Sequence, residues 1–165
     1  MGRKGFSLIE LIVTIGIISI LLGIATISFN QWIRRYNIEK EVKEVYADLM
    51  YVRQQALVTG MNHEVEFSSE NRIVFRRYSS EGDAVGTEIR SRDLPYPITI
   101  SDPGSKEIGF NSRGMMTEII PKSVCVFSEY DAPLDSVYIT QSRINVGKIK
   151  NQGSLNCAKD NITLK

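Results

Sequence analysis

The chain has 165 residues, of which 42% are hydrophobic and 24% charged, and its formal net charge is +1 at pH 7. A charge this close to zero gives no long-range attraction to nucleic acid, anionic lipid or an acidic substrate, so any such partner needs a local patch. Outside an apolar N-terminal stretch, the chain has the length of one small domain with a single core.

The first feature in chain order is the apolar stretch from Phe6 to Phe29, which contains no Lys, Arg, Asp or Pro. A helix needs about 20 apolar residues to cross a bilayer, so the stretch is long enough. It is longer than the core of a secretory signal peptide, and no small-residue cleavage site follows it. Arg3 and Lys4 precede it and favour a cytoplasmic N-terminus. We therefore expect a transmembrane helix over 6–29, with the rest of the chain on the opposite side of the membrane.

Glu10 is the one acidic residue in this stretch. A carboxylate in hydrocarbon is costly unless it has a partner. One interpretation is a signal-anchored scaffold domain, in which Glu10 is incidental and the chain keeps Met1. The other interpretation comes from the surrounding residues: "GFSLIE", from Gly5 to Glu10 behind a short basic leader, resembles the class III signal of type IV prepilins and pseudopilins.

The resemblance implies a processing route and a set of partners. Residues 1–5 would be a prepilin leader, a prepilin peptidase would cleave after Gly5, and Phe6 would become the N-methylated first residue. Glu10 would form an assembly salt bridge with the α-amino group of a neighbouring subunit, which relieves the desolvation of both charges. The implied location is the bacterial inner membrane, single-pass with a periplasmic domain, and later a periplasmic or extracellular filament. The implied partners are other pilins or pseudopilins, the peptidase and an assembly platform in the inner membrane.

Many major pilins have a proline two-thirds of the way along this helix, where the present chain has Ile27. Without proline, we expect a continuous helix. Loss of that proline is familiar among minor pilins and pseudopilins, so the resemblance implies a minor subunit.

The helical pattern continues beyond the apolar stretch. Apolar residues recur at alternating steps of four and three, which is typical of one buried helix face, while charged residues fill the other face. Glu39 and Lys43 are spaced as an i,i+4 ion pair, and Gly60 fits the position just after a helix end. We expect an amphipathic continuation over 30–60 that packs on a sheet rather than in a coiled coil. Its buried face would comprise Ile38, Val42, Val45, Leu49, Val52 and Ala56.

The remainder, 61–165, predicts a β-rich periplasmic domain. "EVEF" and "RIVFRRY" alternate around "SSEN" as a hairpin. Further short strands are expected around 88–92, 98–100, 108–110, 124–127, 137–140 and 145–150, separated by turn sequences. Because no βαβ rhythm is present, the sheet should be antiparallel. The predicted fold class is α+β and pilin-like: one long N-terminal helix, half transmembrane and half amphipathic, packed on an antiparallel sheet or small sandwich as one globular domain.

Three further segments resemble the H-type pseudopilins (GspH) and FimT-like minor pilins: "DLMYVRQQALVTGMNHEVEF", "IGFNSRGMM" and "ITQSRINVGKIK". They occur in the order found in that subfamily. The function implied is that of a minor structural subunit, in a tip or initiation complex, of a type IV pilus or a type II secretion pseudopilus. The sequence leaves both machines open.

Catalytic and metal chemistry are not indicated. His63 is the only histidine and has no cysteine nearby, so it supports neither a metal site nor a nucleophile–base pair, and a turn position beside a strand is expected. No serine elbow or phosphate-binding glycine loop is present, and no cofactor is expected. Cys125 and Cys157 either form a disulfide in an oxidising compartment or remain two reduced thiols.

Basic residues raise an alternative function. Arg72, Arg76, Arg77, Arg90 and Arg92 form two local groups, and Arg143, Lys148 and Lys150 form a third. Some FimT-like minor pilins are linked to DNA uptake through basic C-terminal residues, and clustered cations bind phosphates. The third group is therefore the candidate DNA contact. Acidic residues lie between the cations, however, so a solvated sheet face is the favoured interpretation.

Overall fold

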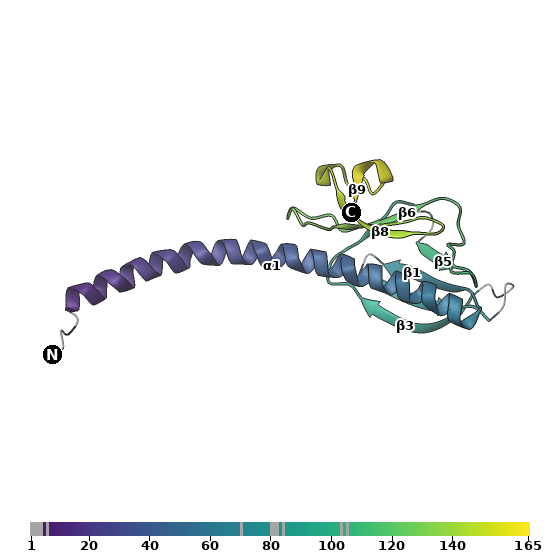
Figure 1. The fold of residues 1–165 in the computed structure, drawn as a ribbon, viewed down its shortest axis with the longest axis horizontal. Coiled ribbons are helices and arrows are strands. Elements are labelled where there is room, and N and C mark those ends of the chain that lie inside the picture. Colours follow the sequence, from purple (N-terminus) through teal and green to yellow (C-terminus); the bar gives the residue numbers. More distant parts are fainter. Residues whose placement is uncertain are drawn as a thin grey trace.

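In a computed structural model of the chain, residues 5, 7–69, 71–79, 83, 85–102, 104 and 106–165 are described, with the backbone alone for 24–28 and 69. One long helix, α1 (Leu8–Thr59), extends far out of a domain made of two sheets (Figure 1). The helix is continuous and gently curved, as expected from the absence of proline.

Both sheets are antiparallel. The four-stranded sheet has the order β3-β2-β1-β5 and contains β1 (His63–Ser69), β2 (Arg72–Arg77), β3 (Thr87–Asp93) and β5 (Glu107–Phe110). The five-stranded sheet has the order β4-β6-β7-β8-β9 and contains β4 (Thr99–Ile100), β6 (Lys122–Cys125), β7 (Ser136–Ile139), β8 (Ile144–Ile149) and β9 (Ile162–Leu164). Two short 3-10 helices, η1 (Gln152–Ser154) and η2 (Lys159–Asn161), lie between β8 and β9.

The second half of α1 packs against both sheets and organises the core. It contacts β1 and β5 of one sheet and β7 and β8 of the other. The predicted apolar stripe is fully buried, with exposed fractions of 0 to 2%; its members are Ile38, Val42, Val45, Leu49, Val52 and Ala56. They pack with residues of both sheets in one cluster, including Phe67 of the four-stranded sheet and Ile139 of the five-stranded sheet. Packing against sheets, rather than in a coiled coil, is confirmed.

The helix ends where the sequence predicts. Gly60 has a φ of 66°, and its backbone N–H donates to the carbonyl of Ala56 at 3.0 Å. A left-handed residue here suits glycine, because other residues have a Cβ that crowds the backbone in this conformation.

The predicted hairpin is present, with Val65 opposite Phe75 in the β1–β2 register. Strand β9 was not predicted, because three residues are too few to show alternation. It pairs with β8 at Gly147, where a Cβ would lie 2.6 Å from Cγ2 of Ile162. The turn position predicted for His63 is wrong: His63 begins β1 and is 2% exposed.

Gly114 offers a test of this packing. Its φ is 68°, and an added Cβ would lie 2.8 Å from Cγ of Leu57 on α1. Gly114→Ala should lower the free energy of unfolding by about 1–2 kcal/mol because of the left-handed backbone. Gly153→Ala is the matched control, since its Cβ would meet only an oxygen of Asn151 at 3.5 Å. Urea unfolding of the full chain in detergent, followed by near-UV circular dichroism, measures both. Equal stability of the two variants would contradict this account.

Candidate functional site

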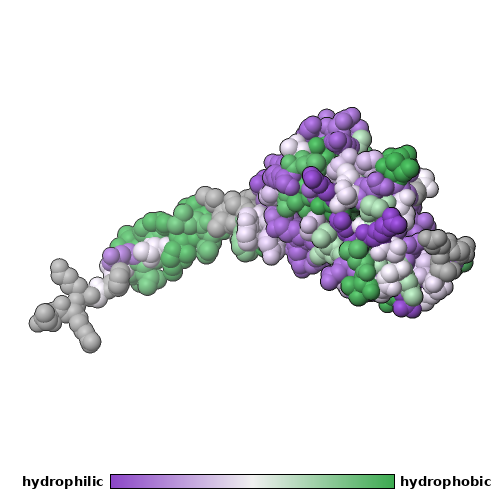
Figure 2. All heavy atoms as spheres, turned by 45° about the vertical axis from the view of Figure 1, so that its right-hand side comes forward, coloured by the Kyte–Doolittle hydropathy of each residue, from purple (hydrophilic) through white to green (hydrophobic). Residues whose placement is uncertain are grey.

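The N-terminal half of α1 presents apolar side chains that the rest of the described chain does not cover. Figure 2 shows this half as a hydrophobic rod projecting from a mixed-polarity domain. Its large side chains are 53 to 78% exposed: Leu8, Ile9, Leu11, Ile12, Val13, Ile15, Ile17, Ile18, Ile20, Leu21 and Leu22. Burying one such side chain is worth about 1.5–3 kcal/mol, so this surface favours an apolar environment.

Over the described residues, no helix has a stretch long and apolar enough to cross a membrane. The transmembrane prediction covers 6–29, and within that range Phe6 and the side chains of 24–28 lie outside the described part. The other leader residues, 1–4, also lie outside it.

Glu10 lies in the first turn of α1. Ser7 precedes the helix as its N-cap, and its side chain makes no capping hydrogen bond. The exposed carboxylate of Glu10 has no hydrogen bond or ion pair with any described residue. The positive end of the helix dipole favours a carboxylate at this position, by about 0.3–1 kcal/mol. That is less than the cost of a charge in hydrocarbon, so Glu10 needs a further partner wherever water is excluded.

Two hydroxyl groups in the exposed half are bonded within the helix. Oγ1 of Thr14 donates to the carbonyl of Leu11 at 2.8 Å, and Oγ of Ser19 donates to the carbonyl of Ile15 at 2.8 Å. Neither donor is therefore left unpaired if water is removed. Gly5 is exposed and lies before the helix.

The sequence interpretation of Arg92 as a solvated basic residue is wrong. Its side chain is 18% exposed and holds α1 to β3 through three carboxylates. Nη1 lies 3.1 Å from Oε1 of Glu41 and 3.1 Å from Oε2 of Glu44, and Nη2 lies 2.9 Å from Oδ2 of Asp48. Glu41 is 2% exposed and Asp48 is 9% exposed.

Burial raises the pKa of both Glu41 and Asp48, and Arg92 opposes that rise. The sequence did contain a signal for this cluster. Glu41, Glu44 and Asp48 are spaced to share one side of a helix, and that side flanks the apolar stripe. The arginine that joins them comes from a strand 44 residues beyond Asp48, and this pairing depends on the tertiary fold.

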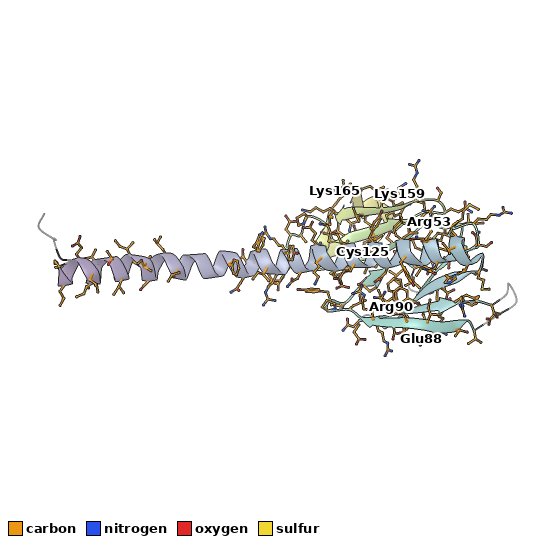
Figure 3. The ribbon with its side chains drawn as sticks, turned by 60° about the horizontal axis from the view of Figure 1, so that its bottom comes forward. Arg53, Glu88, Arg90, Cys125, Lys159 and Lys165 are labelled. Carbon is orange, nitrogen blue, oxygen red and sulfur yellow. A yellow bond between two sulfur atoms is a disulfide. The ribbon has the colours of Figure 1, made fainter. Side chains whose placement is uncertain are left out.

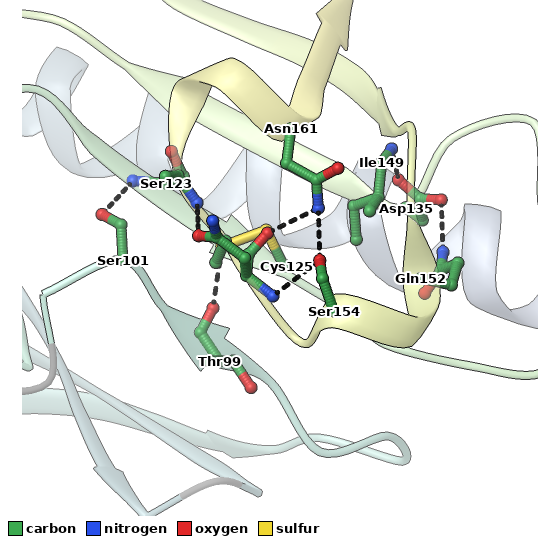
Figure 4. Close-up of a disulfide and its surroundings, with 12 residues drawn as sticks. Thr99, Ser101, Ser123, Cys125, Asp135, Ile149, Gln152, Ser154 and Asn161 are labelled. Atoms are coloured by element: carbon green, nitrogen blue, oxygen red, sulfur yellow. Dashed lines mark hydrogen bonds between the residues drawn. A yellow bond between two sulfur atoms is a disulfide. The ribbon is translucent and has the colours of Figure 1, made fainter.

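Cys125 and Cys157 form a disulfide that attaches the C-terminal segment to β6. Figure 4 shows the polar network around it. Nδ2 of Asn161 donates to the carbonyls of Asn151 at 3.1 Å and Asn156 at 2.8 Å. Asp135 accepts from the backbone of Ile149 at 2.6 Å and from Nε2 of Gln152 at 2.7 Å, and burial raises its pKa.

The candidate DNA contacts do not form one open cationic patch. Nζ of Lys148 pairs with Asp131 at 2.6 Å, Nζ of Lys150 donates to the carbonyl of Asp160 at 2.7 Å, and Arg143 is exposed. Figure 3 places Arg90 and Lys159 on opposite sides of α1. In the part of the chain that is described, no group of three His, Cys, Asp or Glu side chains could hold a metal ion.

Residues 1–26 match the family model of the prokaryotic N-terminal methylation motif. The fold matches solved structures at low sequence identity. The type IV minor pilin FimU of Pseudomonas aeruginosa is 13% identical, with a TM-score of 0.53 over 68% of this chain and 90% of that one. The minor pseudopilin EpsH from the type II secretion system of Vibrio cholerae is 11% identical, with a TM-score of 0.53 over 68% of this chain and 96% of that one. A second EpsH structure is 13% identical, with a TM-score of 0.52 over 67% and 95% of the two chains. No curated protein sequence matches the chain.

The chain carries a prepilin-type methylation motif on a pilin-like fold. The matched segment includes Gly5, Phe6 and Glu10 and extends into the N-terminal half of α1. The likeness to solved structures covers about two-thirds of the chain.

Removing Arg92 tests the carboxylate cluster. Arg92→Met should destabilise the pilin-like domain by about 3 kcal/mol at neutral pH, because it leaves buried carboxylates without a cation. The exposed Arg77→Met, on β2, is the control and should change stability by less than about 0.5 kcal/mol.

The stability lost in Arg92→Met should also depend on pH in a defined direction. Glu41 and Asp48 have folded-state pKa values above their ordinary 4.5 and 3.8, so the folded state binds more protons than the unfolded chain. The contribution of these two groups to stability therefore falls as pH rises through and above those values. Without Arg92 the pKa values rise further, so the deficit of Arg92→Met should shrink from pH 7.5 to pH 5. A deficit that grows on acidification would contradict this assignment.

Proposed function

We propose that this chain is a minor structural subunit of a pilus-like filament, made as a prepilin and anchored in the bacterial inner membrane through 6–29. A prepilin peptidase removes 1–5, Phe6 becomes the methylated N-terminus, and the pilin-like domain lies in the periplasm. The methylation motif and the pilin-like fold support this proposal.

One observation carries the proposal: Glu10 lies in the first turn of an exposed apolar helix and has no partner among the described residues. Cleavage after Gly5 would create an α-amino cation at the positive end of the helix dipole, where a cation is disfavoured. Glu10 lies four residues along the chain from Phe6. A neighbouring helix shifted by about one turn brings its amino group level with this carboxylate.

Such a pair would set the register of assembly. Each charge removes the other's need for water, so the pair forms only when two helices meet at the correct axial offset. The apolar side chains around it bind equally well at several offsets, because apolar contact is not directional. Glu10 would thus provide specificity, and the apolar half of α1 would provide most of the affinity.

The proposal covers both filament types. FimU comes from a type IV pilus and EpsH from a type II secretion system, and this chain resembles both with a TM-score of 0.53. The continuous helix fits the minor rather than the major class of subunit, and a place in a tip or initiation complex fits a minor subunit.

Replacing the carboxylate tests the proposal. Glu10→Gln should leave membrane insertion and peptidase cleavage intact. It should lower incorporation into the sheared filament fraction by about tenfold or more, which corresponds to a loss of about 1.4 kcal/mol of association free energy. Glu39→Gln is the matched control, because it removes a carboxylate from the ion pair with Lys43 on the same helix, at 2.7 Å. Such exposed pairs are worth about 0.3–0.5 kcal/mol. Equal incorporation of the two variants would rule out a register role for Glu10.

A further inference from the structure

The helix α1 carries a distinct set of side chains between its exposed half and the folded domain. Phe29, Trp32 and Tyr36 stack in a row, with ring centroids 6.1 and 5.8 Å apart and interplanar angles of 23° and 19°. Arg34 and Arg35 lie within the same two turns and are exposed. These five residues are called the junction collar.

The aromatic row faces away from the folded domain. On the opposite side of the helix, the guanidinium of Arg34 lies 5.4 Å from the ring centroid of Tyr130, and the buried stripe begins at Ile38. Phe29, Trp32 and Tyr36 are 58, 59 and 54% exposed. The three rings thus form a continuous aromatic surface on α1, just N-terminal to the folded domain, that no described residue covers.

The two arginines differ from the next cations on α1. Lys40 and Lys43 pair with Glu44 and Glu39, at 3.7 and 2.7 Å. Among the described residues, by contrast, neither Arg34 nor Arg35 has a carboxylate at ion-pair distance.

The pKa of Asp131 is lowered mainly by its hydrogen bond and charge interaction with Lys148, at 2.6 Å, and Arg35 adds a smaller charge interaction. The junction collar therefore combines half-exposed aromatic rings with two guanidinium groups that have no carboxylate at ion-pair distance among the described residues.

We propose that the junction collar binds the anionic phospholipid headgroups of the membrane leaflet that faces the folded domain, and so seats the domain against the bilayer. The proposal rests on the membrane anchoring described under Proposed function. Indole and phenol rings prefer the boundary between hydrocarbon and water, because each has an apolar body and one polar group. Guanidinium groups bind phosphate oxygens through two parallel hydrogen bonds.

The dimensions agree with this placement. From Phe29 to Tyr36 the helix rises about 10 Å. The polar layer on one side of a bilayer is roughly 5–8 Å thick, so the junction collar spans it. The apolar half then lies in hydrocarbon and the first buried core residue, Ile38, lies just outside the headgroups.

Trp32 is the only tryptophan in the chain, so its fluorescence reports directly on the junction collar. The full chain is reconstituted at low protein-to-lipid ratio in phosphatidylcholine vesicles with 30% phosphatidylglycerol, and insertion is checked by flotation. Brominated lipids of different bromine depth then quench Trp32, and energy transfer to dansyl-labelled phosphatidylglycerol is compared with transfer to dansyl-labelled phosphatidylcholine.

We expect stronger quenching by shallow than by deep bromines. We also expect transfer to phosphatidylglycerol about twofold or more above transfer to phosphatidylcholine, because basic residues near a membrane surface attract anionic lipids. The double variant Arg34→Gln, Arg35→Gln should lose the preference for phosphatidylglycerol. Lys40→Gln, Lys43→Gln, on the same helix, should retain it.

Two results would overturn the proposal, each in a different way. A chain that does not float with vesicles would refute the anchoring itself. A chain that floats while Trp32 remains unquenched, or that shows no lipid preference, would refute the headgroup contact and leave the anchoring intact.

Discussion

The structure depends on the burial of one helix face between two sheets. The stripe from Ile38 to Ala56 supplies the centre of the core, and both sheets pack against it. Without that stripe, the four-stranded and five-stranded sheets would each leave an apolar face uncovered, which neither could satisfy alone. The N-terminal part of the same helix, some thirty residues long, is covered by neither sheet. One helix therefore joins a buried core to an exposed apolar surface.

The uncovered half of α1 determines which surroundings the molecule requires. A surface of this kind is stable only in a membrane or against other helices, and the two environments make similar demands on it. Both require satisfied hydroxyl groups, as at Thr14 and Ser19, and both penalise an unpaired charge. Glu10 is therefore the residue for which the two environments differ. A membrane offers it no cation, whereas in the proposed filament a neighbouring processed subunit would offer its terminal amine.

The Arg92 cluster shows how the domain is held to the helix by polar as well as apolar contacts. Strand β3 lies at the edge of its sheet, farthest in strand order from β5, and Arg92 connects it to three carboxylates of α1. The carboxylates outnumber the cation, so the cluster has a directional pH dependence that apolar contacts lack. It also fixes the rotation of β3 about the helix, because guanidinium hydrogen bonds are directional.

The sequence predicted the features whose signals are local. The buried stripe, the helix end at Gly60 and the β1–β2 hairpin each follow from spacing or turn chemistry within a short segment, and the structure has all three. The leader motif is also local. The features that were missed join distant segments: Arg92 to α1, β9 to β8, and His63 into the core. Their positions depend on which strands meet, and one sequence carries no periodic signal for that.

The most direct test of the account is the N-terminus of the protein after expression with and without a prepilin peptidase, determined by intact mass and N-terminal sequencing. The account predicts a chain that begins at Phe6 and carries one added methyl group, found only when the peptidase is present. That result would place an α-amino group where Glu10 of a neighbour can meet it. A chain that begins at Met1 in both cases would contradict the account and leave a signal-anchored domain in which Glu10 is incidental.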